Sequence, residues 1–389
     1  MEEIKIKRWL SELGKNAYLN GVRFISKRNY PTHQKIIFLL SFPSTSESML
    51  DALYQEWPKN LIICYTKNSS KLAKKYKDKG CQVYPIDNYI VLLRRIIPFI
   101  QGAKIVLCDN YFAFLSGVHF SEETKNVQLW HANGAIKRFG LEAEYAKRSS
   151  FKDQERYRAV YRTWTHYVVS SDRMKNIFEK NYQIKMNCLN FGYPPTDDFF
   201  DTQWLEKSIK IFREKFPTDK KVLLYAPTYR EGSSITSSDF KKMIENLQKD
   251  WLVLIKCHPH EQERYIDFFN RTDVILDFQG LTLNEVLPSV DCLVTDYSSI
   301  PFEYSLANPR GKIVFYCYDY DEYNQKVGIE RDFKEWAPGE IVYESQALCR
   351  AIQSDNRTSL TDFNQEWNQY ANGTAKTQLI EWVKKYNEA

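Results

Sequence analysis

The stretch DCLVTDYSSIPFEY, Asp291–Tyr304, predicts a turn from a buried strand into a helix. Its apolar run, Cys292–Thr295, is typical of a buried strand, and Asp296 ends that run. Ser298 and Ser299 follow. A strand that passes through two serines into a helix brings free backbone N–H groups and hydroxyls to the positive end of the helix dipole, where phosphate binds. Capping of the helix by serine explains the same residues equally well, so the other strand ends must decide between these interpretations.

Short apolar runs alternate with longer amphipathic stretches along the chain. We expect strands at Lys35–Ser41, Leu61–Thr66, Cys81–Pro85, Lys104–Cys108, Val127–Trp130, Tyr167–Val169, Lys221–Tyr225, Leu252–Ile255, Val274–Leu276, Cys292–Thr295 and Lys312–Tyr316. Such alternation is typical of α/β folds in which helices cover parallel sheets. The two series meet near Gly192–Asp198, which predicts two doubly wound, Rossmann-type domains, residues 1–193 and 194–389. Whether the last helix packs back on the first domain stays open. Because ligands bind beyond the carboxyl ends of such strands, we expect one central cleft between the domains.

Composition and charge narrow the function classes. The 389 residues, 43% hydrophobic, can build two folded cores. Residues 1–165 hold 27 lysines and arginines against 15 acidic residues, whereas the remainder holds 27 against 34. A basic half indicates an anionic partner, such as a membrane surface, nucleic acid or polyphosphate. We expect neither a signal peptide nor a membrane-spanning helix, and the eight cysteines fit reduced, buried thiols.

Three stretches of the basic half combine basic and aromatic residues at helical spacing. They are residues 1–30, Tyr89–Ile100 and Tyr145–Trp164. This combination favours a helix that lies on an anionic lipid surface. A core-packed helix with a solvated basic face is the commoner outcome for any one of them. Because the charge asymmetry points the same way, we expect at least one of them to contact membrane.

Three further strand ends carry residues that suit phosphate chemistry. One predicted strand runs into Trp130 and His131, a second into the Pro-Thr-x-Arg sequence, and a third into Lys256 and His258. A single histidine at a strand end is more often structural than catalytic. Two of the six histidines at strand ends, beside arginine and a serine pair, favour a catalytic cleft.

Several common site types lack their sequence signatures. His258 and His260 have neither the helical spacing nor the cysteine or carboxylate partners of a zinc site, so we expect no bound metal there. No G-x-S-x-G elbow supports a Ser-His-Asp hydrolase. Glycine-rich loops of dinucleotide binders and P-loop NTPases are absent as well. The sequence therefore predicts no obligatory cofactor and leaves a requirement for Mg²⁺ open.

Taken in order, these segments resemble the CDP-glycerol glycerophosphotransferases of bacterial wall teichoic acid synthesis. That family shows W-H-G-T-x-x-K-x-x-G, A-P-T-x-R, H-P, and T-D-Y-S-S followed by an aromatic, an acidic residue and Tyr. The matching segments here are Trp130–Gly140, Ala226–Arg230, His258–Pro259 and Thr295–Tyr304, with further likeness at Cys108–Tyr111, Asn284–Leu287 and Asp319–Tyr323. Because the likeness keeps one order over about residues 105–345, it is far more specific than any single motif.

The resemblance implies a GT-B-like architecture with the active site between two domains, and peripheral attachment to the cytoplasmic face of the cell membrane. It implies CDP-glycerol as donor and an undecaprenyl-diphosphate-linked disaccharide glycerol-phosphate as acceptor, an anionic membrane surface as partner, and no nucleic acid. The terminal hydroxyl of the acceptor would attack the β-phosphorus of the donor and release CMP.

Site residues carry over by position. His131 resembles the proposed general base of the family, and His258 resembles its second essential histidine, at the phosphate. The positions expected around the diphosphate are Thr228, Arg230, Ser298 and Ser299, with Lys256 and Asp296 behind them and with Glu303 where the family commonly has Asp.

The chain departs from the family pattern in two loops. Ala132 and Asn133 stand in place of Gly and Thr, although Gly134 still supplies flexibility. Pro195 replaces the arginine of G-Y-P-R-N-D, which puts a substrate-holding role of that arginine in doubt. The short chain favours a primer-extending enzyme over a polymerase with additional domains. The choice between glycerol and ribitol phosphate, the number of units added and the oligomeric state stay open.

Two other functions remain as alternatives. One is a transferase of the same architecture that uses a nucleotide sugar. The other is a non-catalytic binder of polyanions, which only the basic half supports and which the acidic second half disfavours.

Overall fold

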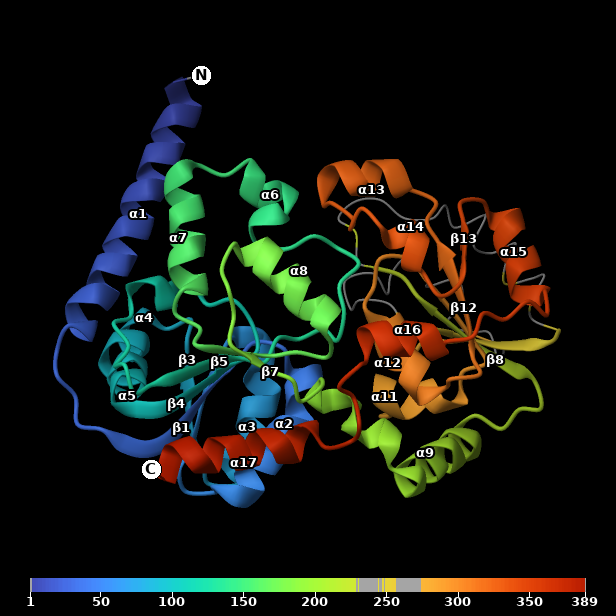
Figure 1. The fold of residues 1–389 in the computed structure, drawn as a ribbon, viewed down its shortest axis with the longest axis horizontal. Helices are drawn as coiled ribbons and strands as arrows, with labels where there is room; N and C mark the ends of the chain where they lie inside the picture. The colour runs from blue at the N-terminus through green and yellow to red at the C-terminus, as the bar shows by residue number, and fades with distance from the viewer. Residues whose placement is uncertain are drawn as a thin grey trace.

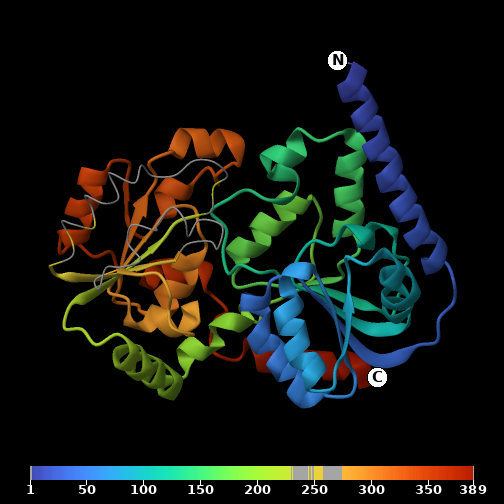
Figure 2. The same ribbon diagram turned by 180° about the vertical axis from the view of Figure 1, so that it is seen from behind.

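Two parallel sheets stand side by side, each with helices on its two faces (Figures 1 and 2). The computed structural model describes residues 2–228, 230, 244, 247, 249–256 and 274–388, and for residues 2–11 and 388 it describes the backbone alone. Both sheets point the carboxyl ends of their strands toward the region between them, so the residues that follow these strands meet there.

The first sheet has seven parallel strands in the order β3-β2-β1-β4-β5-β6-β7. They are β1 (His33–Leu40), β2 (Leu61–Tyr65), β3 (Gln82–Pro85), β4 (Ala103–Cys108), β5 (Lys125–Gln128), β6 (His166–Val168) and β7 (Cys188–Leu189). The direction of winding reverses between β1 and β4. In open sheets of this kind, ligands bind beyond the strand ends at that reversal.

The second sheet repeats the same winding. Its described strands follow the order β10-β9-β8-β11-β12-β13 and all pair in parallel, so the reversal falls between β8 and β11. They are β8 (Lys221–Ala226), β9 (Trp251–Ile255), β10 (Val274–Ile275), β11 (Cys292–Thr295), β12 (Lys312–Tyr316) and β13 (Glu340–Val342). The expectation of two doubly wound α/β sheets is confirmed. All eleven predicted strands are present, and β7 and β13, each at a sheet edge, were missed.

Alternating side chains of the central strands separate the two faces of the first sheet. Ile36 and Phe38 face one side, where they pack with α2 (Pro43–Glu56), α3 (Ser70–Asp78) and α17 (Ala375–Glu388). Ile37 and Leu39 face the other side. That side is covered by α1 (Glu2–Ser26), α4 (Tyr89–Val91), α5 (Ile97–Gly102), α7 (Phe151–Tyr161) and α8 (Asp172–Tyr182), with α6 (Glu144–Lys147) beyond them.

The helices of the second half surround the second sheet in the same manner. They are α9 (Thr202–Lys215), α11 (Leu283–Val286), α12 (Ile300–Ala307), α13 (Tyr320–Lys326), α14 (Phe333–Trp336), α15 (Ser345–Gln353) and α16 (Thr361–Trp367). Leu348 of α15 packs on one face, whereas Phe302 of α12 belongs to an apolar cluster that continues from the second sheet into the first half of the molecule.

The last helix, α17, lies against the first sheet although it ends the chain (Figure 1). The buried carboxylate of Asp197 accepts hydrogen bonds from the backbone N–H groups of Ala375 (3.0 Å) and Lys376 (2.7 Å) at the start of α17. A carboxylate at a helix N-terminus satisfies orphan donors and the helix dipole. The segment that follows the first sheet therefore also fixes the last helix. The division of domains between residues 193 and 194 stays a prediction.

The stretches expected to contact membrane have different environments. Within Tyr89–Ile100 the side chains of Leu92, Ile96, Ile97 and Ile100 are fully buried, so most of this run is core. Ile90 remains exposed. On the other two stretches Leu13, Phe24, Tyr145 and Phe151 are exposed. No helix in the described part of the chain is long and apolar enough to cross a membrane.

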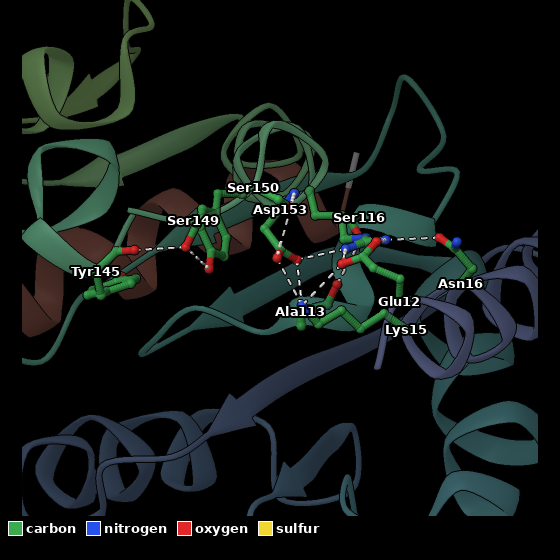
Figure 3. A network of polar contacts seen from close by, with 11 residues as sticks. Glu12, Lys15, Asn16, Ala113, Ser116, Tyr145, Ser149, Ser150 and Asp153 are labelled. Atoms are coloured by element: carbon green, nitrogen blue, oxygen red, sulfur yellow. Dashed lines mark hydrogen bonds and ion pairs between the residues drawn. The ribbon is translucent and has the colours of Figure 1, made fainter. Parts of the chain in front are cut away.

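An ionic network fastens α1 to α7 (Figure 3). Arg156 bonds to both carboxylate oxygens of Glu12, with one contact at 2.7 Å, and to Asp153 at 2.7 Å. Lys15 reaches the same Asp153 at 2.8 Å. The Arg156 guanidinium is the main cause that holds the pKa of Glu12 below its ordinary value. A planar guanidinium that binds two carboxylates fixes orientation as well as distance, so α1 is held in place along α7.

Candidate active site

A strained turn directs His131 away from the end of β5. The backbone of Trp130 has a φ of 63°, in the left-handed region that costs a residue other than glycine roughly 1–2 kcal/mol. Its N–H donates to the side-chain oxygen of Gln128 at 2.8 Å, and its ring packs against Phe139 and Phe178. Strain of this kind persists where the surroundings fix it, commonly at functional sites.

The imidazole of His131 is held in one tautomer. Its Nδ1 lies 3.0 Å from the main-chain oxygen of Asp109. A carbonyl oxygen only accepts hydrogen bonds, so Nδ1 carries the proton and Nε2 keeps a lone pair. The ring also stacks on Phe42 with 3.7 Å between centroids. Burial, together with the positive charge of Lys137, lowers the pKa of His131 to about 4. The ring is therefore a neutral acceptor of protons near pH 7.

The carboxylate of Asp109 holds the turn that carries Phe42. This buried group, at the end of β4, accepts from the N–H of Ser41 (2.8 Å), the N–H of Phe42 (2.7 Å) and the hydroxyl of Ser46 (3.0 Å). Burial raises its pKa to about 6, against the lowering effect of these hydrogen bonds. Sequence reasoning quoted Cys108–Tyr111 but gave Asp109 no role. A carboxylate directly after a buried strand was the available signal.

The serine pair stands where the sequence predicted it. β11 ends at Thr295 and α12 begins at Ile300, with Ser298 and Ser299 between them and both partly exposed. Ser299 precedes the helix but makes no side-chain capping bond, and Ser298 accepts only a long bond of 3.4 Å from the N–H of Ile300. Capping therefore does not account for both hydroxyls.

Asp296 organises the loops beyond β8 and β11. Its buried carboxylate accepts from the N–H and hydroxyl of Thr228, at 2.8 and 2.7 Å. Arg230 also donates to it, at 2.7 Å. Asp296 thus links Thr228 and Arg230, and its place behind a phosphate contact stays a prediction.

Arg230 is occupied by carboxylates in this structure. Its Nε and Nη2 bind both oxygens of Asp319 at 2.5 and 2.9 Å, and its Nη1 binds Asp296 and the main-chain oxygen of Thr228. Four of the five N–H groups of the guanidinium are thereby engaged. The structure brings Arg230 to the predicted cleft, but as the centre of a buried ion-pair cluster.

Lys256 and Glu303 face one another across the same region. Lys256 follows β9 and is exposed, yet the surrounding protein still lowers its pKa by desolvation while the charge of Glu303 raises it. On Glu303, in the first turn of α12, burial raises the pKa to about 8. Its Oε2 has no hydrogen-bond partner among the described residues.

The loop after His131 lies directly against α12. The amide nitrogen of Asn133 donates to the side chain of Asn368 at 2.6 Å, and a Cβ on Gly134 would stand 2.4 Å from the ring of Phe302. Close approach, rather than flexibility, therefore explains Gly134. Five residues separate His131 from Lys137, one more than in the family pattern, so the loop differs in length as well as in residue type.

Two predictions, the role of His258 and the absence of a metal at His258 and His260, are not tested by the structure. His258, the predicted second histidine, lies outside the described residues, so its role stays a prediction. Among the described residues, no group of three or more His, Cys, Asp or Glu side chains is arranged to hold a metal ion. The sequence also gave no role to Lys137, which interacts electrostatically with His131 and with the Arg230 cluster.

Comparisons with known proteins agree with this arrangement. Residues 26–385 match the family described as CDP-Glycerol:Poly(glycerophosphate) glycerophosphotransferase. Teichoic acid glycerol-phosphate primase of Bacillus subtilis (strain 168) is 30% identical over 375 residues, which cover 94% of this chain and 96% of that protein. The primase of Staphylococcus aureus (strain NCTC 8325 / PS 47) is 25% identical over 97% of this chain and 99% of its own.

Solved structures show the same fold. The wall teichoic acid polymerase TagF superimposes with a TM-score of 0.75 at 17% identity, over 99% of this chain and 97% of that chain. The UDP-GlcNAc 2-epimerase of Neisseria meningitidis superimposes less well, with a TM-score of 0.57 at 14% identity, over 90% of this chain. The predicted GT-B-like class and the predicted family are confirmed. The chain belongs to the CDP-glycerol:poly(glycerophosphate) glycerophosphotransferase family and is a transferase.

Proposed function

We propose that this transferase moves glycerol phosphate from CDP-glycerol to the terminal hydroxyl of a prenyl-diphosphate-linked teichoic acid primer. The observation that carries this proposal is the pairing of a neutral imidazole of fixed tautomer, His131, with a serine pair at the N-terminus of α12. The imidazole can accept the proton of an attacking hydroxyl, and the serine pair suits a phosphate. Membership of the family and the primases among its relatives support the same donor and acceptor.

The reaction is a single displacement at phosphorus. The acceptor oxygen forms a bond to the β-phosphorus of CDP-glycerol, the bond from that phosphorus to the bridging oxygen breaks, and CMP leaves with the bonding electrons. The proton of the acceptor hydroxyl passes to Nε2 of His131. Two negative charges of a bound diphosphate raise the pKa of His131 toward the working pH.

Charge that develops on the phosphate oxygens is stabilised from the second domain. Ser298 and Ser299 offer hydroxyls beside the first N–H groups of α12, and the helix dipole adds to the attraction. Thr228 and Arg230 shape the neighbouring loop through Asp296, and Lys256 supplies an ammonium. His258 follows Lys256 by two residues and is proposed to contact the phosphate as well.

The acceptor is carried by a lipid, which supports peripheral binding at the cytoplasmic face of the cell membrane. Tyr145 and Phe151 are 62% and 75% exposed, on the adjoining helices α6 and α7. Lys147 and Arg148 lie between them in the sequence, and Lys152 follows Phe151. Exposed aromatic rings among cations suit the interface of an anionic bilayer. Phe151→Ser is expected to reduce pelleting with anionic vesicles, and an unchanged bound fraction would contradict this assignment.

Product analysis tests the whole proposal. The protein is incubated with a synthetic prenyl-diphosphate disaccharide glycerol-phosphate acceptor and with CDP-glycerol, CDP-ribitol, UDP-sugars or CMP-sugars in turn. The expected result is CMP release and a mass increase of one or more glycerol-phosphate units with CDP-glycerol. Transfer of a sugar, or no turnover with CDP-glycerol, would reject the proposal. The product mass also gives the number of units added.

A further inference from the structure

Lys137 lies on the loop that carries His131, at the point where this loop pairs with the second half of the chain. Lys137 and Ile329 form an antiparallel bridge. On either side of it the N–H of Arg138 donates to Gly328 O at 3.0 Å, and the N–H of Glu330 donates to Ile136 O at 2.8 Å. Residues opposite each other in such a pair project their side chains to the same side. The backbone of Lys137 is thus fixed to the second domain.

Lys137 interacts electrostatically with three groups of the site. Asp296 attracts its ammonium and Arg230 repels it, and Lys137 in turn disfavours the protonated form of His131. The bridge to Ile329 places the backbone of Lys137 beside the second half of the chain, on the loop that carries His131. It makes no hydrogen bond or ion pair to any residue in the described part of the chain. Burial consequently lowers its pKa, because the charge is desolvated without a direct partner.

Arg230 alone cannot balance the negative charges of a bound diphosphate. Its single charge stands against the two carboxylates of Asp296 and Asp319, which leaves that cluster with one net negative charge. A diphosphate with two negative charges would be repelled by such a cluster. Lys137 brings the sum to zero and Lys256 makes it positive, provided that Glu303 is neutral.

We propose that Lys137 binds the phosphoryl group that is transferred from the donor, and thereby links donor binding to the placement of His131. The inference rests on the proposed function and adds a binding residue to it. An ammonium offers three donors around a point charge, which suits phosphate oxygens whose positions change during the displacement. Because Lys137 and His131 lie on one loop, binding of a phosphate oxygen by Lys137 also affects where His131 lies relative to that phosphate.

Substitution of Lys137 tests the inference with two readouts. In Lys137→Met we expect the affinity for CDP-glycerol, measured by calorimetry, and kcat/KM for CMP release each to fall about 10- to 100-fold, the range for a charged hydrogen bond. Affinity for CMP, which lacks the transferred phosphate, should change less than about threefold. Lys137→Arg should recover part of the loss. Arg138→Met is the matched control, because Arg138 is the next residue and faces Glu144 instead.

The outcomes separate the two proposals. If the unaltered enzyme turns over CDP-glycerol and Lys137→Met binds and reacts equally well, the inference is overturned while the proposed function stands. An equal loss of CMP and CDP-glycerol affinity would also overturn it, because it would show general damage to the cleft. If the unaltered enzyme does not use CDP-glycerol, the proposed function fails and the inference fails with it. Thermal unfolding checks the fold, and Lys137→Gln serves if the Met variant does not fold.

Discussion

The two sheets of this enzyme use one structural position for different purposes. In each sheet a buried aspartate follows the fourth strand of the winding and accepts from the turn that follows the first strand. Asp109 accepts from Ser41 and Phe42 after β1, and Asp296 accepts from Thr228 after β8. Arg230 pairs with Asp296, whereas no cation in the described part of the chain pairs with Asp109. The first arrangement positions a base through apolar stacking, and the second arranges charges for an anion.

The cleft combines an uncharged environment around His131 with a charged environment around Asp296. Around His131 the contacts are a carbonyl oxygen and aromatic rings, and burial of the ring keeps the imidazole unprotonated. Around Asp296 the contacts are hydroxyl, N–H and guanidinium groups. General-base chemistry needs the first environment and stabilisation of phosphate charge needs the second. The same fold supplies both because only the residues at the strand ends differ.

The largest effect should follow from removal of the base. His131→Ala is expected to lower the rate of CMP release with lipid acceptor by about 10²- to 10⁴-fold, the usual contribution of general-base catalysis. The affinity for CDP-glycerol should change little, since the imidazole acts on the hydroxyl of the acceptor and not on the donor. Single-turnover kinetics with saturating donor measures the first quantity, and calorimetry measures the second. Turnover close to that of the unaltered enzyme would show that His131 is not the general base.

A smaller effect is expected when the cation beside Asp296 is removed. Arg230→Met leaves Asp296 and Asp319 buried near each other without their cation. Breaking a buried ion pair on one side commonly costs about 3–5 kcal/mol, so the free energy of unfolding in urea should fall by that order. Arg310→Met, at an exposed position, is the control. If Arg230→Met unfolds like the control but loses affinity for CDP-glycerol, Arg230 contacts the phosphate, as the sequence suggested. The proposal that the carboxylates occupy Arg230 and that Lys137 binds the phosphoryl group is then wrong.

The strands and the family motifs could be predicted because their information is local. Each central strand is a continuous apolar run, and Asp296, Ser298 and Ser299 stand directly after one of them. The two strands that were missed, β7 and β13, have only two and three residues, and each lies at a sheet edge, where burial imposes less pattern.

The partners of the site residues could not be predicted in the same way. Arg230 and Asp319 are 89 residues apart, and Asn133 and Asn368 are 235 apart. Only the strand order brings these pairs together. For the same reason, a sequence pattern that matches a phosphate-binding arginine does not reveal that two carboxylates already hold it. That Lys137 has no partner among the described residues likewise follows from the pairing of residues 136–138 with 328–330, which has no local signature.

The smallest predicted effect concerns pH and the first of the two aspartates. The pKa of Asp109 is raised to about 6 in the folded protein, against an ordinary value near 3.8. The folded state therefore binds the proton more tightly than the unfolded state, so this group destabilises the fold as pH rises from about 4 to 6. A shift of about two units corresponds to roughly 3 kcal/mol. Asp109→Asn removes the titration, so the difference in unfolding free energy between the unaltered enzyme and the variant should change by that order between pH 4 and 7. Urea unfolding at several pH values measures it. A flat difference for Asp109→Asn would mean that the hydrogen bonds from Ser41, Phe42 and Ser46 compensate the burial of the carboxylate.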